Sequence, residues 1–255
     1  MLIKKDKHGN ELINGDCLEV MPLIRDKSID LILADLPYGT TACKWDTVIN
    51  LNLLWEEYKR IIKDNGAIVL TATNPFATSL IQSNIDWFKY EWIWHKNMTS
   101  GFALAKKQPL RNHELILVFY KKQPIYNPIK ELRDLNKSSK QRMQYDFTST
   151  KGINEQQGGI KKIQFIPEDK KMSYPKTVKK FNGVNPHKRF HTTEKPLSLM
   201  EYLIKTYTNE QMLVLDNTMG SGTTCLAAKN LNRKFIGIEK EIKYYKIACK
   251  RCGFF

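Results

Sequence analysis

The sequence of 255 residues predicts an α/β fold built on a mostly parallel, doubly wound sheet. Short apolar, β-branched runs alternate with amphipathic helical stretches, as in chains whose parallel strands are joined by helices. The apolar runs are continuous rather than strictly alternating, which is typical of strands that are covered on both faces. The length fits one large domain, or one domain that carries an insertion.

The predicted strands fall into two groups along the chain. The first group comprises residues 29–35, 66–72, 90–96 and 113–120, which are expected to form one half of the sheet. The second group follows a long interval and comprises residues 212–216 and 234–238, which are expected to form the other half together with a short strand near 11–14. These runs are rich in β-branched residues, and several hold aromatic ones; both types pack well on a pleated surface.

Amphipathic stretches lie between most of these runs. Residues 51–66 place apolar side chains near helical spacing, and Gly66 is the expected end of that helix. Similar patterns predict helices at residues 75–87, 196–208, 222–232 and 241–251. Helices between successive strands are the connections that parallel strands require.

The charge of the chain is strongly positive and unevenly distributed. There are 41 Lys and Arg against 26 Asp and Glu, which gives a formal net charge of +15. Residues 121–190 alone hold 17 basic and six acidic residues, a net +11, with aromatic residues interleaved. Such an excess indicates a polyanionic partner, although a charge run is also compatible with a solvated face.

Several features bear on the compartment. The first residues contain no apolar core of a signal peptide, and no run approaches the roughly 18 apolar residues of a spanning helix. Nucleic acid is therefore preferred over a membrane as the partner, and a cytoplasmic location is expected. The five cysteines are odd in number and scattered, which predicts reduced thiols. Cys249 and Cys252 lack a second pair of ligands, so we expect no metal site.

A glycine-rich turn follows the strand at 212–216. It reads Asp216-Asn217-Thr218-Met219-Gly220-Ser221-Gly222-Thr223-Thr224 and opens a helix. Glycines at such a turn let a ligand approach the backbone closely. Glu239 ends the next strand, where an acid can bind both hydroxyls of a ribose. The pair indicates a pocket for an adenosine-containing cofactor. A plain tight turn is the alternative, and the third glycine of a dinucleotide motif is replaced by Cys225.

A second motif, Asp35-Leu36-Pro37-Tyr38, follows the strand at 29–35 directly. The carboxyl end of a parallel strand is where ligands bind. Asp35 and the Pro37 carbonyl can accept the two hydrogens of an exocyclic amine, which aims the nitrogen lone pair at a methyl donor. Tyr38 can stack on a base that is flipped out of a duplex. An ordinary strand-end turn is an equally consistent interpretation of this tetrapeptide alone.

Taken together, the motifs resemble those of the amino-methylating DNA methyltransferases of the permuted group, in which the catalytic motif precedes the cofactor motif. DLPY is similar to their D/N/S-P-P-Y/F motif, and DNTMGSGTT is similar to D-P-F-x-G-S-G-T-T. HTTEKPLSLMEYLI at 191–204 resembles their H-x-T-x-K-P segment. The opening LINGDCLEVMPLIRDKSIDLILADLPY is similar too, so that the resemblance covers nearly everything outside 121–190.

The resemblance implies a Rossmann-like fold of the S-adenosylmethionine-dependent methyltransferases, with the last strand of the first half antiparallel. Residues 1–120 and 191–255 would form the catalytic domain, and 121–190 a basic target-recognition insertion. The implied reaction transfers methyl from S-adenosylmethionine to N6 of adenine in double-stranded DNA, without a metal or a covalent intermediate; cytosine N4 is the alternative. A homodimer and a paired restriction endonuclease are compatible with the resemblance, which decides neither.

The resemblance also assigns residues to the site. The catalytic residues would be Asp35, Pro37 and Tyr38. The cofactor residues would be Asp16, Asp35, Leu36, Lys195, Asp216, Asn217, Gly220, Ser221, Gly222, Thr223 and Glu239.

Two positions depart from the family pattern. Leu36 stands where Pro is usual, with little effect expected because the backbone and the flanking residues do the work. Asn217-Thr218 replace Pro-Phe, whose aromatic ring normally packs against the cofactor's adenine, so the sequence leaves open which residue does this.

Other substrates and other classes of protein remain alternatives. Asp35 in place of Ser favours adenine, and the absence of a Pro-Cys dipeptide disfavours methylation of cytosine C5. RNA or protein glutamine as substrate, a catalytically silent DNA-binding protein and a dehydrogenase are the rival interpretations. Trp45-Asp46 and Asn74-Pro75-Phe76 are candidates for the edge of the site. His95 and His113 are interpreted as structural.

Overall fold

The fold is described from a computed structural model of the chain, which describes residues 1–39, 47–132, 172–185, 187 and 189–254. The chain divides into two compact units. The larger unit comprises residues 1–127 and 176–255, and the smaller one residues 128–175. Within the described residues, no helix has the length and apolar character needed to cross a membrane.

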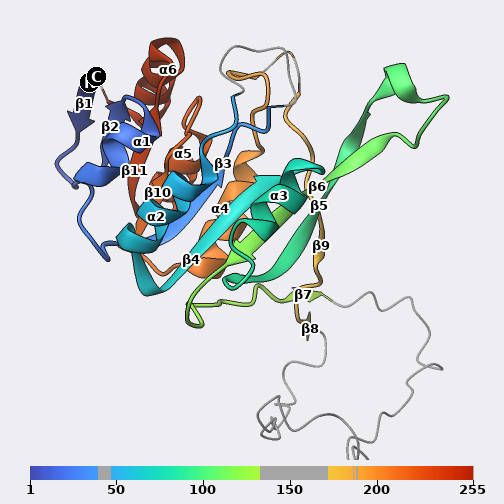
Figure 1. Cartoon of the computed structure of the whole chain (residues 1–255), viewed down its shortest axis with the longest axis horizontal. Helices are drawn as coiled ribbons and strands as arrows, with labels where there is room; N and C mark the ends of the chain where they lie inside the picture. The colour runs from blue at the N-terminus through green and yellow to red at the C-terminus, as the bar shows by residue number, and fades with distance from the viewer. Residues whose placement is uncertain (40–46, 133–171, 186, 188, 255) are drawn as a thin grey trace, which may run out of the picture. The chain divides into compact units, whose positions relative to one another are not determined.

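Nine of the described strands form one sheet in the larger unit (Figure 1). In chain order they are β1 (Leu2–Lys5), β2 (Glu11–Asn14), β3 (Ile29–Asp35), β4 (Ile62–Ala72), β5 (Phe88–Ser100), β6 (Arg111–Phe119), β9 (Val178–Lys180), β10 (Leu213–Asp216) and β11 (Lys234–Glu239). Their order across the sheet is β1-β2-β11-β10-β3-β4-β6-β5-β9. The five adjacent strands β2, β11, β10, β3 and β4 are parallel to one another.

The half of the sheet beyond β4 contains the antiparallel strand that the resemblance implies, β6. β6 runs antiparallel to both β4 and β5, between which it lies. β1 is antiparallel to β2 at one edge, and β9 is parallel to β5 at the other. The prediction of a mostly parallel, doubly wound sheet with an antiparallel last strand is therefore confirmed.

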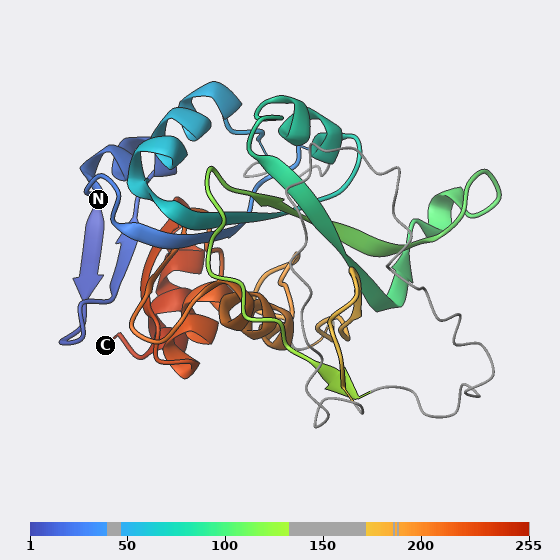
Figure 2. The same ribbon diagram turned by 90° about the horizontal axis from the view of Figure 1, so that it is seen from below.

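Helices cover both faces of this sheet (Figure 2). One face packs against α1 (Cys17–Val20), α2 (Leu51–Ile61) and α3 (Phe76–Gln82), and the other against α4 (Leu197–Tyr207), α5 (Thr223–Asn230) and α6 (Ile242–Cys252). β3 shows why its sequence is continuously apolar. Leu31 and Leu33 belong to the core on one face, whereas Ile32 and Ala34 belong to the core on the other.

Two helix predictions were too long. The helix expected at 51–66 ends at Ile61, and β4 begins at the next residue. Gly66 is therefore not a helix end but lies within β4, where a Cβ atom would come within 2.9 Å of the Asp30 carbonyl oxygen. It is needed because the backbones of β3 and β4 approach closely there. Similarly, α3 ends at Gln82 rather than 87, and β5 follows a turn.

The smaller unit is described only at its two ends, by β7 (Glu131–Leu132) and β8 (Met172–Ser173), which pair antiparallel. Most of the basic segment lies outside the described residues. The last part of the 121–190 segment belongs to the larger unit, because Val178–Lys180 form β9.

The described cysteines, Cys17, Cys225, Cys249 and Cys252, are free thiols and buried. Cys43 lies outside the described residues. In the described part of the chain, no group of three metal-binding side chains comes together.

Candidate active site

The candidate site is a cleft of about 620 Å³ at the carboxyl ends of the parallel strands. β11, β10 and β3 are neighbours in the sheet, and each ends in an acid: Glu239, Asp216 and Asp35 respectively. Parallel strands present these ends at one edge of the sheet, so the topology brings together motifs that are about 180 to 200 residues apart.

Nearly all of the sequence-predicted site residues line this cleft. Those that do are Asp16, Asp35, Leu36, Pro37, Tyr38, Lys195, Asp216, Asn217, Gly220, Ser221, Thr223 and Glu239. Gly222 does not line it. It precedes α5 with φ of +81°, and a Cβ atom there would come within 2.8 Å of the Ala248 Cβ. Its role in the structure is thus to let α5 and α6 approach closely.

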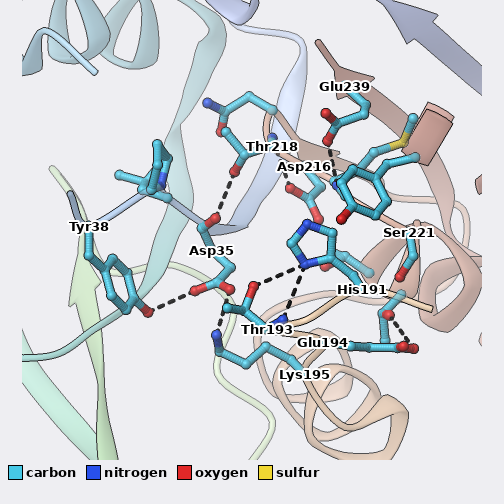
Figure 3. Close-up of a pocket in the computed structure, with 18 of the residues that line it drawn as sticks. Asp35, Tyr38, His191, Thr193, Glu194, Lys195, Asp216, Thr218, Ser221 and Glu239 are labelled. Carbon is cyan, nitrogen blue, oxygen red and sulfur yellow. Dashed lines mark hydrogen bonds and ion pairs between the residues drawn. The ribbon is translucent and has the colours of Figure 1, made fainter. Parts of the chain in front are cut away.

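The side chain of Asp35 is held by donors from three segments, and two of these donors, Tyr38 and Lys195, are seen in Figure 3. The Tyr38 hydroxyl donates to Asp35 Oδ1 at 2.7 Å, and the Thr71 hydroxyl donates to the same oxygen. Thr71 is in place because it pairs with Asp35 in the register of β3 and β4. The Tyr38 ring stacks on Phe76 with centroids 5.3 Å apart. Burial, and then the Asp35 carboxylate, raise the pKa of Tyr38, so that the phenol stays a donor.

The third donor is Lys195, whose Nζ lies 2.5 Å from Asp35 Oδ2 and 3.5 Å from Glu114 Oε2. The Lys195 side chain is only 8% exposed. Burial by itself lowers the pKa of Lys195, but Asp35 and Glu114 outweigh it and hold that pKa above its ordinary value. The sequence interpretation assigned Lys195 to the cofactor, whereas the structure places its ammonium group on the side chain of Asp35.

Glu114 extends the Asp35–Lys195 ion pair into a chain of alternating charges that ends at Lys96. Burial raises its pKa, but Lys195 and Lys96 more than offset that and leave the pKa below the ordinary value. Lys96 contacts the second carboxylate oxygen of Glu114. Neither Glu114 nor Thr71 was predicted from the sequence as a member of the site. The available signal for Glu114 was a charged residue inside the apolar run HELILVFY.

The cofactor-type loop is also organised by carboxylates. Asp216 accepts a hydrogen bond from the Thr218 amide at 3.1 Å, and burial raises its pKa to about 7. Glu239 accepts one from the Gly220 amide at 2.8 Å, and burial raises its pKa as well. Gly220 has φ of +51°, a left-handed conformation that favours glycine.

Arg251, from α6, joins this loop to the HTTEKP segment. Its guanidinium lies 2.8 Å from the Glu194 carboxylate and donates to the carbonyl oxygen of Ser221 at 2.9 Å. The Glu194 side chain is 6% exposed, so the pair is buried. On the same segment, His191 packs edge-on against Tyr244 of α6, with ring centroids 4.2 Å apart. The sequence offered no motif that marked Arg251.

Asp16 and the remaining candidates occupy distinct places. Asp16 caps α1 through the Leu18 amide and lies 3.0 Å from Lys240 Nζ, which holds its pKa below the ordinary value although burial opposes this. His95 and His113 face each other across β5 and β6. Trp45-Asp46 lie outside the described residues.

A family model for N6/N4 DNA methylases matches residues 29–250. The chain belongs to this DNA methylase family. The type II methyltransferase M.HinfI of Haemophilus influenzae is 28% identical over 95% of this chain and 68% of its own length. M1.MboII of Moraxella bovis is 29% identical over 92% and 93%. M.HindIII of Haemophilus influenzae is 54% identical over a shorter stretch, 26% of this chain and 21% of its own.

Solved structures share the fold of this DNA methylase. The M1.HpyAVI–SAM complex superposes with a TM-score of 0.62 at 23% identity, covering 94% of this chain and 97% of that one. The cytosine-N4-specific PvuII DNA methyltransferase gives a TM-score of 0.67 at 15% identity, covering 98% and 90%. The predicted methyltransferase fold class is thereby confirmed.

Asn217 and Thr218, which replace Pro-Phe in this DNA methylase, form hydrogen bonds to other segments of the site. The Tyr58 hydroxyl donates to Asn217 Oδ1 at 2.6 Å. The Thr218 hydroxyl donates to the main-chain carbonyl of Asp35 at 3.0 Å, so that the cofactor-type loop is bonded directly to the catalytic-type motif. Thr218 offers no ring to an adenine. Among the described residues, the aromatic side chains that line the cleft are Tyr38, Trp94, His191 and Tyr244, and His191 lies beside Gly220 of this loop.

Proposed function

We propose that this chain transfers a methyl group from S-adenosylmethionine to the N6 amine of an adenine in double-stranded DNA. The observation that carries the proposal is the position of Asp35. Its carboxylate is held in the same cleft as the loop of Asp216 and Gly220, and Thr218 bonds the two motifs together. A methyl acceptor at Asp35 and a donor at the loop would therefore lie side by side.

The cleft suits the chemistry of this cofactor. Its volume of about 620 Å³ lies within the range of small-molecule sites, roughly 300–1,000 Å³. Asp16, Asp216 and Glu239 surround it with carboxylates, which suit a cation and a ribose. S-adenosylmethionine would supply an electrophilic methyl carbon on a sulfonium sulfur. Glu239 would hold the ribose, Asp16 would lie near the adenine, and the 220–223 loop would face the remainder.

Asp35 and Pro37 would orient the amine. A carboxylate oxygen accepts two hydrogen bonds. Oδ1 already has Tyr38 and Thr71 as donors, whereas Lys195 is the partner of Oδ2 among the described residues. Oδ2 therefore retains a position for one amine hydrogen, and the Pro37 carbonyl would accept the other. Bonds of this kind hold the nitrogen lone pair toward the reacting carbon.

Tyr38 would support the flipped base. Phe76 stacks on its ring, while Tyr38 itself lines the cleft. Extrusion of a base costs a few kcal/mol, and stacking on an aromatic side chain offsets about 1–3 kcal/mol of this. The hydroxyl bond to Asp35 fixes the orientation of the ring before the base arrives.

The choice of adenine rests on Asp35. The names of the relatives add only the class that they share, type II methyltransferase. Cytosine N4 is the second candidate, because the family model includes N4 methylation and because the PvuII enzyme of the same fold is cytosine-N4-specific. The relatives named as type II methyltransferases support a further part of the proposal, namely that a restriction endonuclease is paired with this chain.

We also assign the basic 121–190 segment to target recognition. Its net charge of +11 would neutralise phosphates, and each contact releases counterions, so binding should weaken steeply with salt. Binding to duplex DNA that is independent of salt between 50 and 200 mM would contradict this assignment.

The test is single-molecule sequencing, with modification calling, of DNA from cells that express the chain, against an empty-vector control. We expect one sequence motif with modified adenines, and none with Asp35→Ala or Asp35→Asn. Both variants should retain duplex binding, because Asp35 is not part of the basic segment. Modified cytosines would favour the second candidate, and absence of any modification would refute the proposal.

A further inference from the structure

β5 and β6 continue beyond the rest of the sheet as a hairpin, here called the β5–β6 arm (residues 96–113; Figures 1 and 2). β4 pairs with β6 only at residues 115–119, so β4 does not extend alongside the arm. The tip is ordered by a single helical turn, Phe102–Leu104. The Leu104 amide donates to the Gly101 carbonyl at 2.9 Å, and the Gln108 amide to the Leu104 carbonyl at 3.0 Å.

The surface of the arm combines positive charge with exposed apolar groups. It carries Lys106, Lys107 and Arg111, and the sequence has no acid between residues 96 and 113; Lys96, at the base of the arm, is paired with Glu114. Its apolar side chains are unusually open to solvent: Phe102 is 67% exposed, Leu104 44% and Met98 40%. Exposed apolar groups at the tip, Phe102 and Leu104, with cations beside them, mark an interaction surface rather than part of a core.

The arm begins at the candidate active site. Lys96 and Met98, at its base, line the cleft. From Lys96 to Gly101 the strand advances five residues, or about 17 Å at about 3.3 Å per residue. A base that enters the cleft comes from a duplex lying at its mouth. An arm that starts at this mouth and runs outward therefore passes alongside that duplex.

We propose that the β5–β6 arm is a second DNA-contacting element, in addition to the basic 121–190 segment. Lys106 and Lys107 contact phosphates, and Phe102 packs against a base or sugar exposed where the duplex opens. The inference rests on the proposed function. Duplex DNA is favoured over a second copy of this chain because each copy carries +15, and two cationic arms would repel.

The first test reverses the charge of the arm. Lys106→Glu/Lys107→Glu is compared with Lys7→Glu/Lys59→Glu, which changes the same charge at exposed lysines that do not line the cleft. Binding of a fluorescent duplex is measured against salt concentration. We expect the arm variant to bind about 10-fold more weakly or worse, and its log–log salt slope to fall by about 1.8 for two lost phosphate contacts. The control should change neither slope nor affinity to this extent.

The second test removes the apolar tip. Phe102→Ala should weaken duplex binding about fivefold or more without altering the salt slope, because stacking is lost and no phosphate contact is. Leu23→Ala is the matched control, since Leu23 is 70% exposed and lies away from the cleft lining. Titration of S-adenosylmethionine should give wild-type affinity for every variant.

The outcomes separate the two proposals. If the wild-type chain methylates DNA while both arm variants bind as their controls do, the arm proposal is wrong and the proposed function stands. If the wild-type chain neither binds nor methylates DNA, both fail. If Phe102→Ala converts a wild-type dimer into a monomer by light scattering, the arm packs on a second copy and the DNA assignment is overturned.

Discussion

Replacement of Lys195 by Met should damage both stability and activity. Its ammonium group lies between Asp35 and Glu114, at 2.5 and 3.5 Å. The side chains of Lys195 and Glu114 are 8% and 12% exposed, so little water can replace the lost charge. Methionine has a similar length and fills the space, which separates the electrostatic effect from a cavity.

The expected magnitude follows from the burial of the pair. Breaking a buried ion pair by removing one partner typically costs about 3–5 kcal/mol, because the other charge remains uncompensated. Lys96 still contacts Glu114, so we expect the lower end, about 3 kcal/mol. Asp35 also loses the donor on Oδ2, and turnover should fall by about 100-fold, the scale seen when one orienting hydrogen bond is removed.

Urea unfolding with a paired variant tests this account. Lys195→Met/Glu114→Gln removes one positive and one negative charge together, so it should recover about 1–3 kcal/mol relative to Lys195→Met alone. Turnover should not recover, because Asp35 still lacks its donor. The reasoning would be refuted if Lys195→Met unfolded within about 0.5 kcal/mol of wild type, or if the added Glu114→Gln change made the protein less stable still.

Three further predictions concern the cofactor-type loop and its supports. Gly222→Ala should cost about 1–3 kcal/mol more in urea unfolding than Gly9→Ala, since both have φ of +81° but only Gly222 has a neighbour within 2.8 Å; equal costs would contradict the close packing. The pKa of Asp216 is raised on folding to about 7, so its contribution to stability is present below about pH 4 and lost as pH rises toward 7. Thermal unfolding of Asp216→Asn between pH 4 and 8 should lack that fall in stability. A pH profile identical to that of the wild type would contradict the raised pKa of Asp216. Arg251→Met should raise the KM for S-adenosylmethionine about 10-fold with kcat nearly unchanged, whereas Lys250→Met, an exposed neighbour, should leave both near wild type.

Much of the fold could be predicted from the sequence because the signals are local. The run at 29–35 is apolar at every position that faces either core, so it had to be a strand covered on both sides. Errors arose where a long-range contact decided the residue. Gly66 resembles a helix end locally, but its lack of a side chain is required by the Asp30 carbonyl of a neighbouring strand.

The same division holds for the site. Asp35, Asp216 and Glu239 could be identified from the sequence because each follows an apolar strand, and parallel strands end at one edge of a sheet. The residues that surround these acids could not be identified from the sequence. Thr71 reaches Asp35 only through the register of β3 and β4, and Glu114 only because β6 runs antiparallel beside β4.

The sequence by itself thus determined the class of fold, the order of its motifs and the acids that mark the cleft, since these depend on short-range pattern and on the rules of parallel sheets. Only the tertiary structure decided which charges meet inside it. The ammonium group of Lys195 contacts Asp35. Arg251, in the last helix, contacts both the HTTEKP segment and the cofactor-type loop. These partners meet because they are close in space, although 30 to 160 residues separate them in the chain, and no local spacing in the sequence is diagnostic of such a pair.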